Sequence, residues 1–499
     1  MITIADVLSP ITIFIFSSLL TIILCKFTEK MKAKGRVLIA LWFLVIFSAA
    51  ICAVWNLALK YHASSPTCPL LSITLSGNEF GIFSSAFLVD SVSVYLTIIF
   101  TFTAVIVTFY ALLCVNNSDG NAGRYYAMML FLTGCVIGTA FAGDFLTLFI
   151  FWEITAACSS FLLIYGRTPE SIHATLKYLV MIIVASAFII YALSIIYAIS
   201  GTLNFWAVRQ ILATMQDKRL LEIAFLFMAA GYSIEAAIVP FHVWLPDAYT
   251  AAPASSSAFL SALVDQASYY VLLRVLLYIL TPPTVLPWVL MFAIISALTM
   301  VIGNLLALAE INVKRLISYV CIADVGYNLV AITSATELGI MGNLYFFLVG
   351  GITTALAFML VGIFNSMGLE TLEDFSGVGT RMPLTSLAML LAVLSFAGVP
   401  PLAGFIAKYM VFTSALKGNL AWLAVIGVLT SVIQTAYLLR LINYMYAKKP
   451  RNEIKIKEPK IKLIPVLILT FALIVLGLYP TMVLDLISPI INELQLIIT

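Results

Sequence analysis

Charged residues are scarce in this chain. Lys, Arg, Asp and Glu make up only 10% of its 499 residues, and 63% of the residues are hydrophobic. A soluble domain of average composition carries roughly a quarter charged residues. The composition therefore excludes an ordinary soluble protein and predicts an integral membrane protein. The net charge of +3 is too small to indicate a polyanionic partner, and we expect no nucleic-acid binding.

Metal-binding patterns are also missing. The chain has three histidines and seven cysteines, and no two cysteines are close enough in sequence to form a CxxC pair. Most of the cysteines lie in apolar runs, where they are usually small apolar residues of helices. We therefore expect no metal site and no bound cofactor in this chain. Any electron transfer in its assembly would take place in another subunit.

No long polar segment interrupts the chain. The longest predicted loops, near 60–82 and 200–220, have about twenty residues. Neither loop is large enough to be a soluble catalytic domain, and the sequence has no phosphate-binding glycine motif. Transport driven by nucleotide hydrolysis is therefore not expected. The work must be done by side chains within the membrane, and we expect no catalytic residue in the chain.

The chain consists mainly of apolar runs of about 17–25 residues, the length that a helix needs to cross a bilayer. We predict an all-α integral membrane protein with about fourteen transmembrane helices. The predicted spans are 8–25, 37–59, 91–115, 126–143, 145–165, 175–199, 221–239, 255–280, 286–307, 316–333, 339–364, 384–414, 419–446 and 463–485.

These spans divide the chain into four parts. An N-terminal three-helix segment covers 1–125, and a basic loop with a C-terminal helix covers 447–499. Between them, 126–280 and 286–446 each hold about five spans, with a proline break late in each part. This arrangement is compatible with two inverted repeats, the organisation of many transporters.

Basic residues are concentrated in alternate loops. Most of them fall in the loops at 26–36, 116–125, 166–174, 308–315, 365–383 and 447–462. The opposite loops hold only Lys60, Arg209, Lys218, Arg219 and Lys417. Positively charged loops remain in the cytoplasm. We therefore predict a multi-pass protein of the cell membrane with both termini outside.

Two apolar stretches, one in each half of the chain, are interrupted by proline. The breaks are marked by Pro240 and Pro246 in the first stretch and by Pro400 and Pro401 in the second. Proline removes a backbone donor and frees a carbonyl, so a polar or hydrated pocket is expected at each break. A pair of broken helices is typical of an ion or substrate site near the middle of the membrane. Ion movement is therefore the first functional hypothesis.

Polar residues at membrane depth define a candidate ion-translocation site. They are Glu153, Glu235, Asp265, Gln266, Asp324 and Lys408. A charge inside hydrocarbon costs several kcal/mol, so such side chains face a polar interior. Alternative interpretations remain open for two of them, namely a packing hydrogen bond for Glu153 and a fixed salt bridge for Glu235. Asp90 lies nearer a span end and fits a structural role as well as a functional one.

Several motifs occur together and in a fixed order. The longest is FHVWLPDAY at 241–249, and it is supported by the motifs at 272–274, 313–319 and 398–408. This set resembles the antiporter-like subunits of respiratory complex I, of Mrp-type cation/proton antiporters, and of archaeal membrane-bound hydrogenases and ferredoxin-linked respiratory complexes. The resemblance spans most of the chain. It implies two inverted five-helix repeats, discontinuous seventh and twelfth helices, and a central polar axis.

The resemblance also assigns positions along that axis. Glu153 matches the glutamate of the fifth helix, and Lys408 matches the lysine of the twelfth. Glu235 and Gln266 stand where the family has lysines, and Asp324 stands at a histidine or polar position of the tenth helix. Two nearby carboxyls tend to share one proton or to bind a cation between them. A typical glutamate–lysine relay is therefore not expected in the first half.

The function implied by the resemblance is that of an antiporter-like subunit in a multi-subunit respiratory or Mrp-type membrane complex. It would translocate protons or Na⁺ along the polar axis, coupled to redox chemistry elsewhere. The implied partners are other membrane subunits and a soluble redox arm, and iron–sulfur or nickel–iron centres would lie in those partners. The chain itself would be a non-catalytic subunit of an oxidoreductase complex. The alternative is a structural subunit that has lost conduction because central lysines are replaced.

Overall fold

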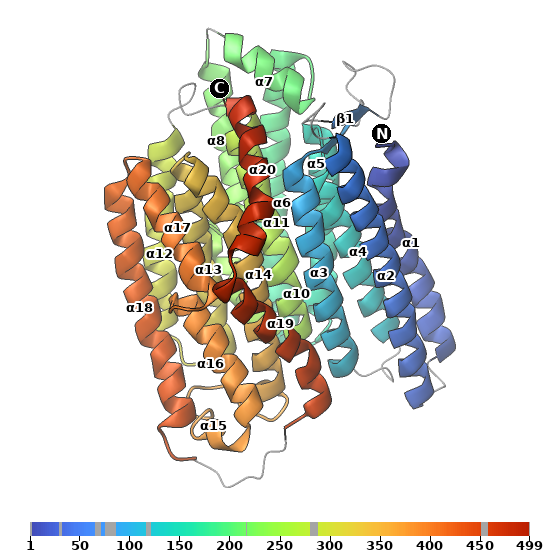
Figure 1. Ribbon diagram of the computed structural model, residues 1–499, viewed down its shortest axis with the longest axis vertical. Coiled ribbons are helices and arrows are strands. Elements are labelled where there is room, and N and C mark those ends of the chain that lie inside the picture. Colours follow the sequence, from blue (N-terminus) through green and yellow to red (C-terminus); the bar gives the residue numbers. More distant parts are fainter. Residues whose placement is uncertain are drawn as a thin grey trace.

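The computed structural model describes residues 2–28, 32–64, 71–74, 86–115, 121–215, 217–279, 288–450 and 458–498. It is a bundle of mostly parallel and antiparallel helices (Figure 1). Within the described ranges, eleven helices are long and apolar enough to cross a membrane. The prediction of a helical multi-pass membrane protein is confirmed. Parts of the predicted loops at 26–36, 60–82, 116–125 and 447–462, and the junction at 280–286, lie outside the described residues.

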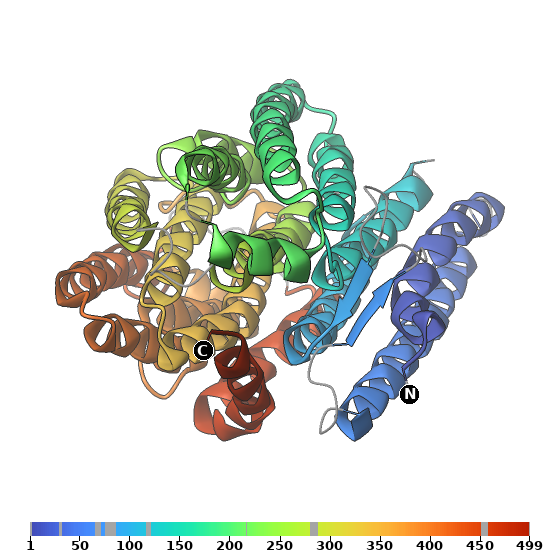
Figure 2. The same cartoon turned by 90° about the horizontal axis from the view of Figure 1, so that it is seen from above.

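The N-terminal part contains three long helices. They are α1 (Ile4–Thr28), α2 (Lys32–Ser64) and α3 (Ser91–Cys114). Helices α1 and α2 lie at one flank of the bundle in both views, and α3 lies between them and the central helices (Figures 1 and 2). The all-α prediction is wrong in one detail. Strands β1 (Leu71–Thr74) and β2 (Ala86–Val89) form a short antiparallel sheet, with Leu71 opposite Val89.

The next helices include one that the sequence did not predict. The elements are α4 (Ala122–Ala140), α5 (Phe145–Ile164), α6 (Pro169–Ser200), α7 (Phe205–Thr214), α8 (Arg219–Glu235), η2 (Phe241–Val243), α9 (Trp244–Ala251), α10 (Ala254–Phe259), η3 (Leu260–Val264), α11 (Asp265–Leu273) and η4 (Arg274–Ile279). Helix α7 falls in the predicted loop at 200–220. Its buried residues Phe205, Val208 and Leu212 recur at helical spacing, and the Asn204 side chain caps its first turn. Ten residues are too short to be recognised as a span.

Two of the next helices lie at the centre of the molecule. They are α12 (Trp288–Ala309), α13 (Val313–Thr333), α14 (Glu337–Asn365), α15 (Val378–Arg381), α16 (Pro383–Ala397), α17 (Ala403–Lys417) and α18 (Ala421–Tyr446). Helices α13 and α14 are buried on nearly every side, whereas α12 and α18 expose one apolar face. A helix that is apolar all round belongs in the interior.

The C-terminal part differs from its prediction. In place of one helix at 463–485, the structure has α19 (Lys460–Leu478) and α20 (Thr481–Ile498). Pro480 lies at the junction, where a missing N–H and a restricted preceding residue end a helix. Both helices pack against α3 and α14. Figure 1 shows the two chain ends at the same end of the molecule and α15 at the other.

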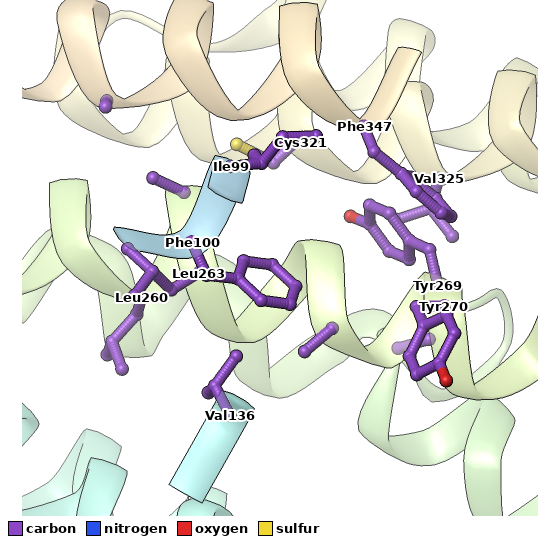
Figure 3. Close-up of a cluster of buried hydrophobic side chains, with 14 of the residues drawn as sticks. Ile99, Phe100, Val136, Leu260, Leu263, Tyr269, Tyr270, Cys321, Val325 and Phe347 are labelled. Atoms are coloured by element: carbon purple, nitrogen blue, oxygen red, sulfur yellow. The ribbon is translucent and has the colours of Figure 1, made fainter. Parts of the chain in front are cut away.

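The apolar core lies where the N-terminal helices meet the central ones (Figure 3). The cluster contains Ile99 of α3, which lies beside Cys321, together with Val136 of α4 and Leu263 of η3; Val325 and Phe347 complete it from α13 and α14. Close packing of this kind holds these five elements at fixed distances from one another. The polar residues described below are embedded in this framework.

A buried ion pair joins the N-terminal helices to the rest of the bundle. Arg274 donates to both carboxylate oxygens of Asp90 at 2.5 and 3.1 Å, and only 1% and 2% of the two side chains are exposed. Asp90 also caps α3 by accepting from the backbone N–H of Ser93. Arg274 donates in addition to the hydroxyl of Tyr270. The geometry assigns Asp90 a structural role.

Candidate ion-translocation site

The first helix break surrounds Glu235. Helix α8 ends at this residue, and the chain continues through 236–240 before α9 begins at Trp244. The indole of Trp244 donates to the carbonyl of Ile234 at 2.9 Å and so satisfies one of the carbonyls that the end of α8 leaves free. The C-terminus of a helix carries partial negative charge, which disfavours a second negative charge there. Glu235 occupies this unfavourable position.

Only one of the two prolines in the first stretch lies at the break. Pro240 precedes η2, as predicted, but Pro246 is the third residue of α9. The assignment of Pro246 to the break is therefore wrong. The first backbone N–H groups of a helix have no intrahelical acceptor, so proline is tolerated in the first turn.

Glu153 and Glu235 lie close enough to interact, but each has a neutral hydrogen-bond partner. The Trp152 indole donates to Oε2 of Glu235, and the Ser186 hydroxyl donates to Oε2 of Glu153 at 2.8 Å. The Oε1 atoms of both glutamates are buried and have no hydrogen-bond partner within the described ranges. No ion pair forms at either carboxyl among these residues. The fixed salt bridge considered for Glu235 is thus not present among the described residues.

Replacing Trp152 with phenylalanine should destabilise the protein by about 1–3 kcal/mol, because a buried acceptor on Glu235 loses its donor. The double variant W152F/E235L should be less affected than W152F, since both polar partners are then removed. Thermal unfolding of the purified protein in detergent measures both. Equal stability of W152F and the parent would contradict the assignment of this hydrogen bond.

Asp265 follows a local distortion of its helix. The five residues of η3 form a π-helical segment that ends just before Asp265, and such segments are frequent at functional sites. The Tyr249 hydroxyl donates to Oδ1 of Asp265 at 2.6 Å, whereas Oδ2 is buried without a partner within the described residues. Gln266 donates to the carbonyl of Ser261. No described hydrogen bond joins Gln266 to another predicted site residue.

The second helix break lies between α16 and α17. Helix α16 ends at Ala397, Gly398 adopts a left-handed conformation with φ of 75°, and Pro400 and Pro401 follow before α17 begins at Ala403. Glycine suits a left-handed C-cap because it has no Cβ. Both prolines lie where the sequence predicts the break.

The Lys408 side chain is hydrogen-bonded at the second break. Its ammonium donates to the Phe396 carbonyl at 2.7 Å, to the Ser431 hydroxyl at 3.1 Å and to the Gln434 amide oxygen at 2.5 Å. The Phe396 carbonyl is one of those freed at the end of α16. A cation is favoured at this end of a helix. The three N–H groups of the Lys408 ammonium therefore have acceptors, and all of these acceptors are neutral.

Asp324 is the nearby carboxylate. It interacts electrostatically with Lys408 and contacts Gln434, and its Oδ1 is buried without a hydrogen bond within the described part of the chain. A cavity of about 20 Å³ lies between Asp324, Lys408 and the end of α16. This volume accommodates about one water molecule. The structure thus brings Asp324 and Lys408 together around a space for a bridging water.

Two buried tyrosines lie near these groups, and the sequence did not single them out. Tyr178 of α6 lies close enough to interact with all three carboxyls of the first half. Tyr269 of α11 lies close enough to interact with Asp265 and Asp324. Aromatic residues in apolar runs are usually packing residues or interface anchors. Only their position in the fold distinguishes these two.

Lys314 was predicted to lie in the basic loop at 308–315, and this prediction is wrong. It lies in the first turn of α13 and is buried. Its ammonium donates to the carbonyls of Thr250 and Ala252 at the end of α9. Lys314 therefore caps the second half of the first broken helix. The adjacent Arg315 is more exposed and pairs with Asp247 and Glu310.

Comparison with known proteins identifies the family of this chain. The family described as NADH:quinone oxidoreductase/Mrp antiporter, membrane part, matches residues 142–434. The chain belongs to this NADH:quinone oxidoreductase/Mrp antiporter family. The matched residues include both helix breaks and all six predicted site residues. The resemblance predicted from the sequence is confirmed.

Other members of the NADH:quinone oxidoreductase/Mrp antiporter family align over most of the chain. NADH-quinone oxidoreductase subunit N of Desulforamulus reducens is 32% identical over 82% of this chain and 87% of its own length. The F420H2 dehydrogenase subunit N of Methanosarcina mazei is 30% identical over 81% of this chain and 84% of its own. A chain of the membrane-bound sulfane sulfur reductase, an archaeal respiratory membrane complex, has a TM-score of 0.83 at 26% identity and covers 97% of both chains.

Proposed function

We propose that this chain is an antiporter-like subunit of a multi-subunit membrane complex and translocates a proton or Na⁺. The path runs through Glu153, Glu235, Asp265, Asp324 and Lys408, with Gln266 beside Asp265. The observation that carries the proposal is the row of buried ionisable groups that passes both helix breaks. Four of its carboxyls keep a buried oxygen without a hydrogen bond among the described residues. Such groups in a membrane are typical of ion paths.

The row reaches the surface of the bundle at both ends. Glu153 is only partly buried, on the face where α5 meets α6. Lys408 also lines a cavity of about 610 Å³ that opens between α17 and α18. Between these ends, Tyr178 lies near the carboxyls of the first half and Tyr269 lies near Asp265 and Asp324.

Fourteen membrane crossings follow if each interrupted helix counts as one. We then group α8 with α9, α10 with its continuation to η4, α16 with α17, and α19 with α20. The two inverted repeats would cover 126–280 and 286–446, with the N-terminal helices and the C-terminal pair outside them. The basic loops would face the cytoplasm, and both termini would lie outside.

The partners would be other membrane subunits and a soluble redox arm. Several helices expose large apolar side chains, among them Trp55 of α2, Tyr409 of α17 and Phe471 of α19, on faces that lipid or a neighbouring subunit would cover. Iron–sulfur or nickel–iron centres would lie in the redox arm. The family relatives, which include subunits of NADH-quinone oxidoreductase and F420H2 dehydrogenase, support this assignment.

Neutralising either end of the row tests the proposal. We expect E153Q and K408M each to reduce proton or Na⁺ uptake to the background rate in vesicles that hold the assembled complex, because each removes an ionisable group from the proposed path. Uptake is measured with a pH-sensitive dye and with ²²Na⁺. Two exposed residues provide matched controls, E222Q for the glutamate and K417M for the lysine.

The same vesicles distinguish the alternative function. A structural subunit would tolerate E153Q and K408M with full proton and Na⁺ uptake as long as the complex assembles. Unchanged uptake by an assembled complex with both substitutions would therefore overturn the proposed translocation. Normal uptake by E222Q and K417M shows that loss of a charge elsewhere does not impair the complex.

A further inference from the structure

An apolar groove lies beside the ion path but is separate from it. The groove has a volume of about 780 Å³ and runs between α1, α4, α5 and the start of α6. Its size is in the range of ligand-binding sites. The apolar part of its wall includes Leu19, Ile22, Met128, Phe131, Phe161 and Ile164. None of the predicted ion-translocation residues lines it.

One end of the groove is positively charged. Arg124 is in the first turn of α4, and Arg167 is in the turn between α5 and α6; both line the groove and are exposed. Arg124 donates to the amide oxygen of Asn121 at 3.3 Å. Neither arginine forms an ion pair with an acidic residue in the described ranges. Two guanidinium groups suit a phosphate, which they can bind through paired hydrogen bonds.

The rest of the groove suits a hydrocarbon chain. From Arg124 to Phe131 the groove follows α4 for about 10 Å, at 1.5 Å per residue. Leu19 of α1 and Phe161 of α5 are each 58% exposed, so this wall is open toward the membrane. A cationic end above an apolar channel has the polarity of a phospholipid bound by its headgroup.

We propose that this groove binds an anionic phospholipid. Arg124 and Arg167 hold the phosphate, and an acyl chain lies along α1, α4 and α5. The lipid fills the space between the N-terminal helices and the helix that carries Glu153. This site does not depend on the proposed ion transport, because the groove and the row of carboxyls share no residue.

Lipid retention by the purified complex tests the proposal. The complex is delipidated in detergent and incubated with phosphatidylglycerol or phosphatidylcholine that have identical acyl chains, and bound lipid is counted by native mass spectrometry. We expect a preference for phosphatidylglycerol that falls by about tenfold in R124Q/R167G, a change of about 1.4 kcal/mol. Glycine suits position 167, where φ is 52°.

Two further variants test whether the lipid preference depends on the positive charges at positions 124 and 167. R124K/R167K keeps both charges and should retain the preference, whereas R219Q removes an arginine that is 90% exposed and outside the groove and should change nothing. No preference in the wild type, or an unchanged preference in R124Q/R167G, overturns the proposal. So does a photo-crosslinking residue at Phe161 that captures a neighbouring subunit in place of lipid. If the double variant does not assemble, R167G alone is measured.

Discussion

Replacing Arg274 with methionine should lower the free energy of unfolding by about 3–5 kcal/mol, the usual cost of removing one partner from a buried ion pair. The Asp90 carboxylate would lose two hydrogen bonds at 2.5 and 3.1 Å in a place where only 2% of its side chain is exposed. Methionine keeps an unbranched apolar stem, so the loss is mainly electrostatic.

The double variant D90N/R274M distinguishes the electrostatic contribution of the ion pair to stability from the packing contribution of Arg274. Replacing both partners leaves no unpaired charge, so we expect it to recover much of the stability lost in R274M. The amide oxygen that D90N introduces can still cap α3, since asparagine is as good an N-cap as aspartate. Thermal unfolding in detergent, followed by circular dichroism, measures the series, with R219M as the exposed control. A double variant as unstable as R274M would show that the arginine acts through packing alone.

Replacing Gly404 with alanine should impair ion transport strongly. A Cβ at this position would overlap the carbonyl oxygen of Ser395, so α17 must move away from α16. Extra atoms at a packed contact typically cost about 1–3 kcal/mol. Lys408 is one turn further along α17 and bonds the Phe396 carbonyl of α16 at 2.7 Å. The shift that relieves the clash therefore displaces the ammonium from its acceptors.

The experiment compares uptake and stability in the same preparation. We expect G404A to lose more uptake than its loss of folded complex explains, in vesicles prepared as for K408M. G166A is the matched control, since the nearest atom to its new Cβ would be 3.7 Å away. Uptake by G404A equal to that of G166A would contradict the close contact between the two helices.

The sequence was most informative about the broken helices. Pro240, Pro400 and Pro401 have a direct local effect on the backbone, so both breaks could be predicted without the fold. Pro246 misled because a proline in the first turn of a helix has the same sequence signal as a proline in a break. The second helix of the C-terminal part was missed although Pro480 marks its start, since the apolar run continues on both sides.

The partners of the buried charges could not be predicted in the same way. Trp152 and Gln434 are ordinary residues of predicted spans, and Tyr249 ends the motif at 241–249. They meet Glu235, Lys408 and Asp265, respectively, only through tertiary packing. Lys314 was missed for a different reason. Its neighbours in sequence are those of a basic loop, and its burial depends on α9 ending against the first turn of α13.

The two helix breaks carry side chains of opposite character. The first break has a carboxyl at the end of α8, and the second has an ammonium held by neutral oxygens at the end of α16. Two close carboxyls can share a proton or bind a cation, whereas an ammonium repels a cation. The first half of the subunit is therefore suited to hold a positive ion and the second half to repel one.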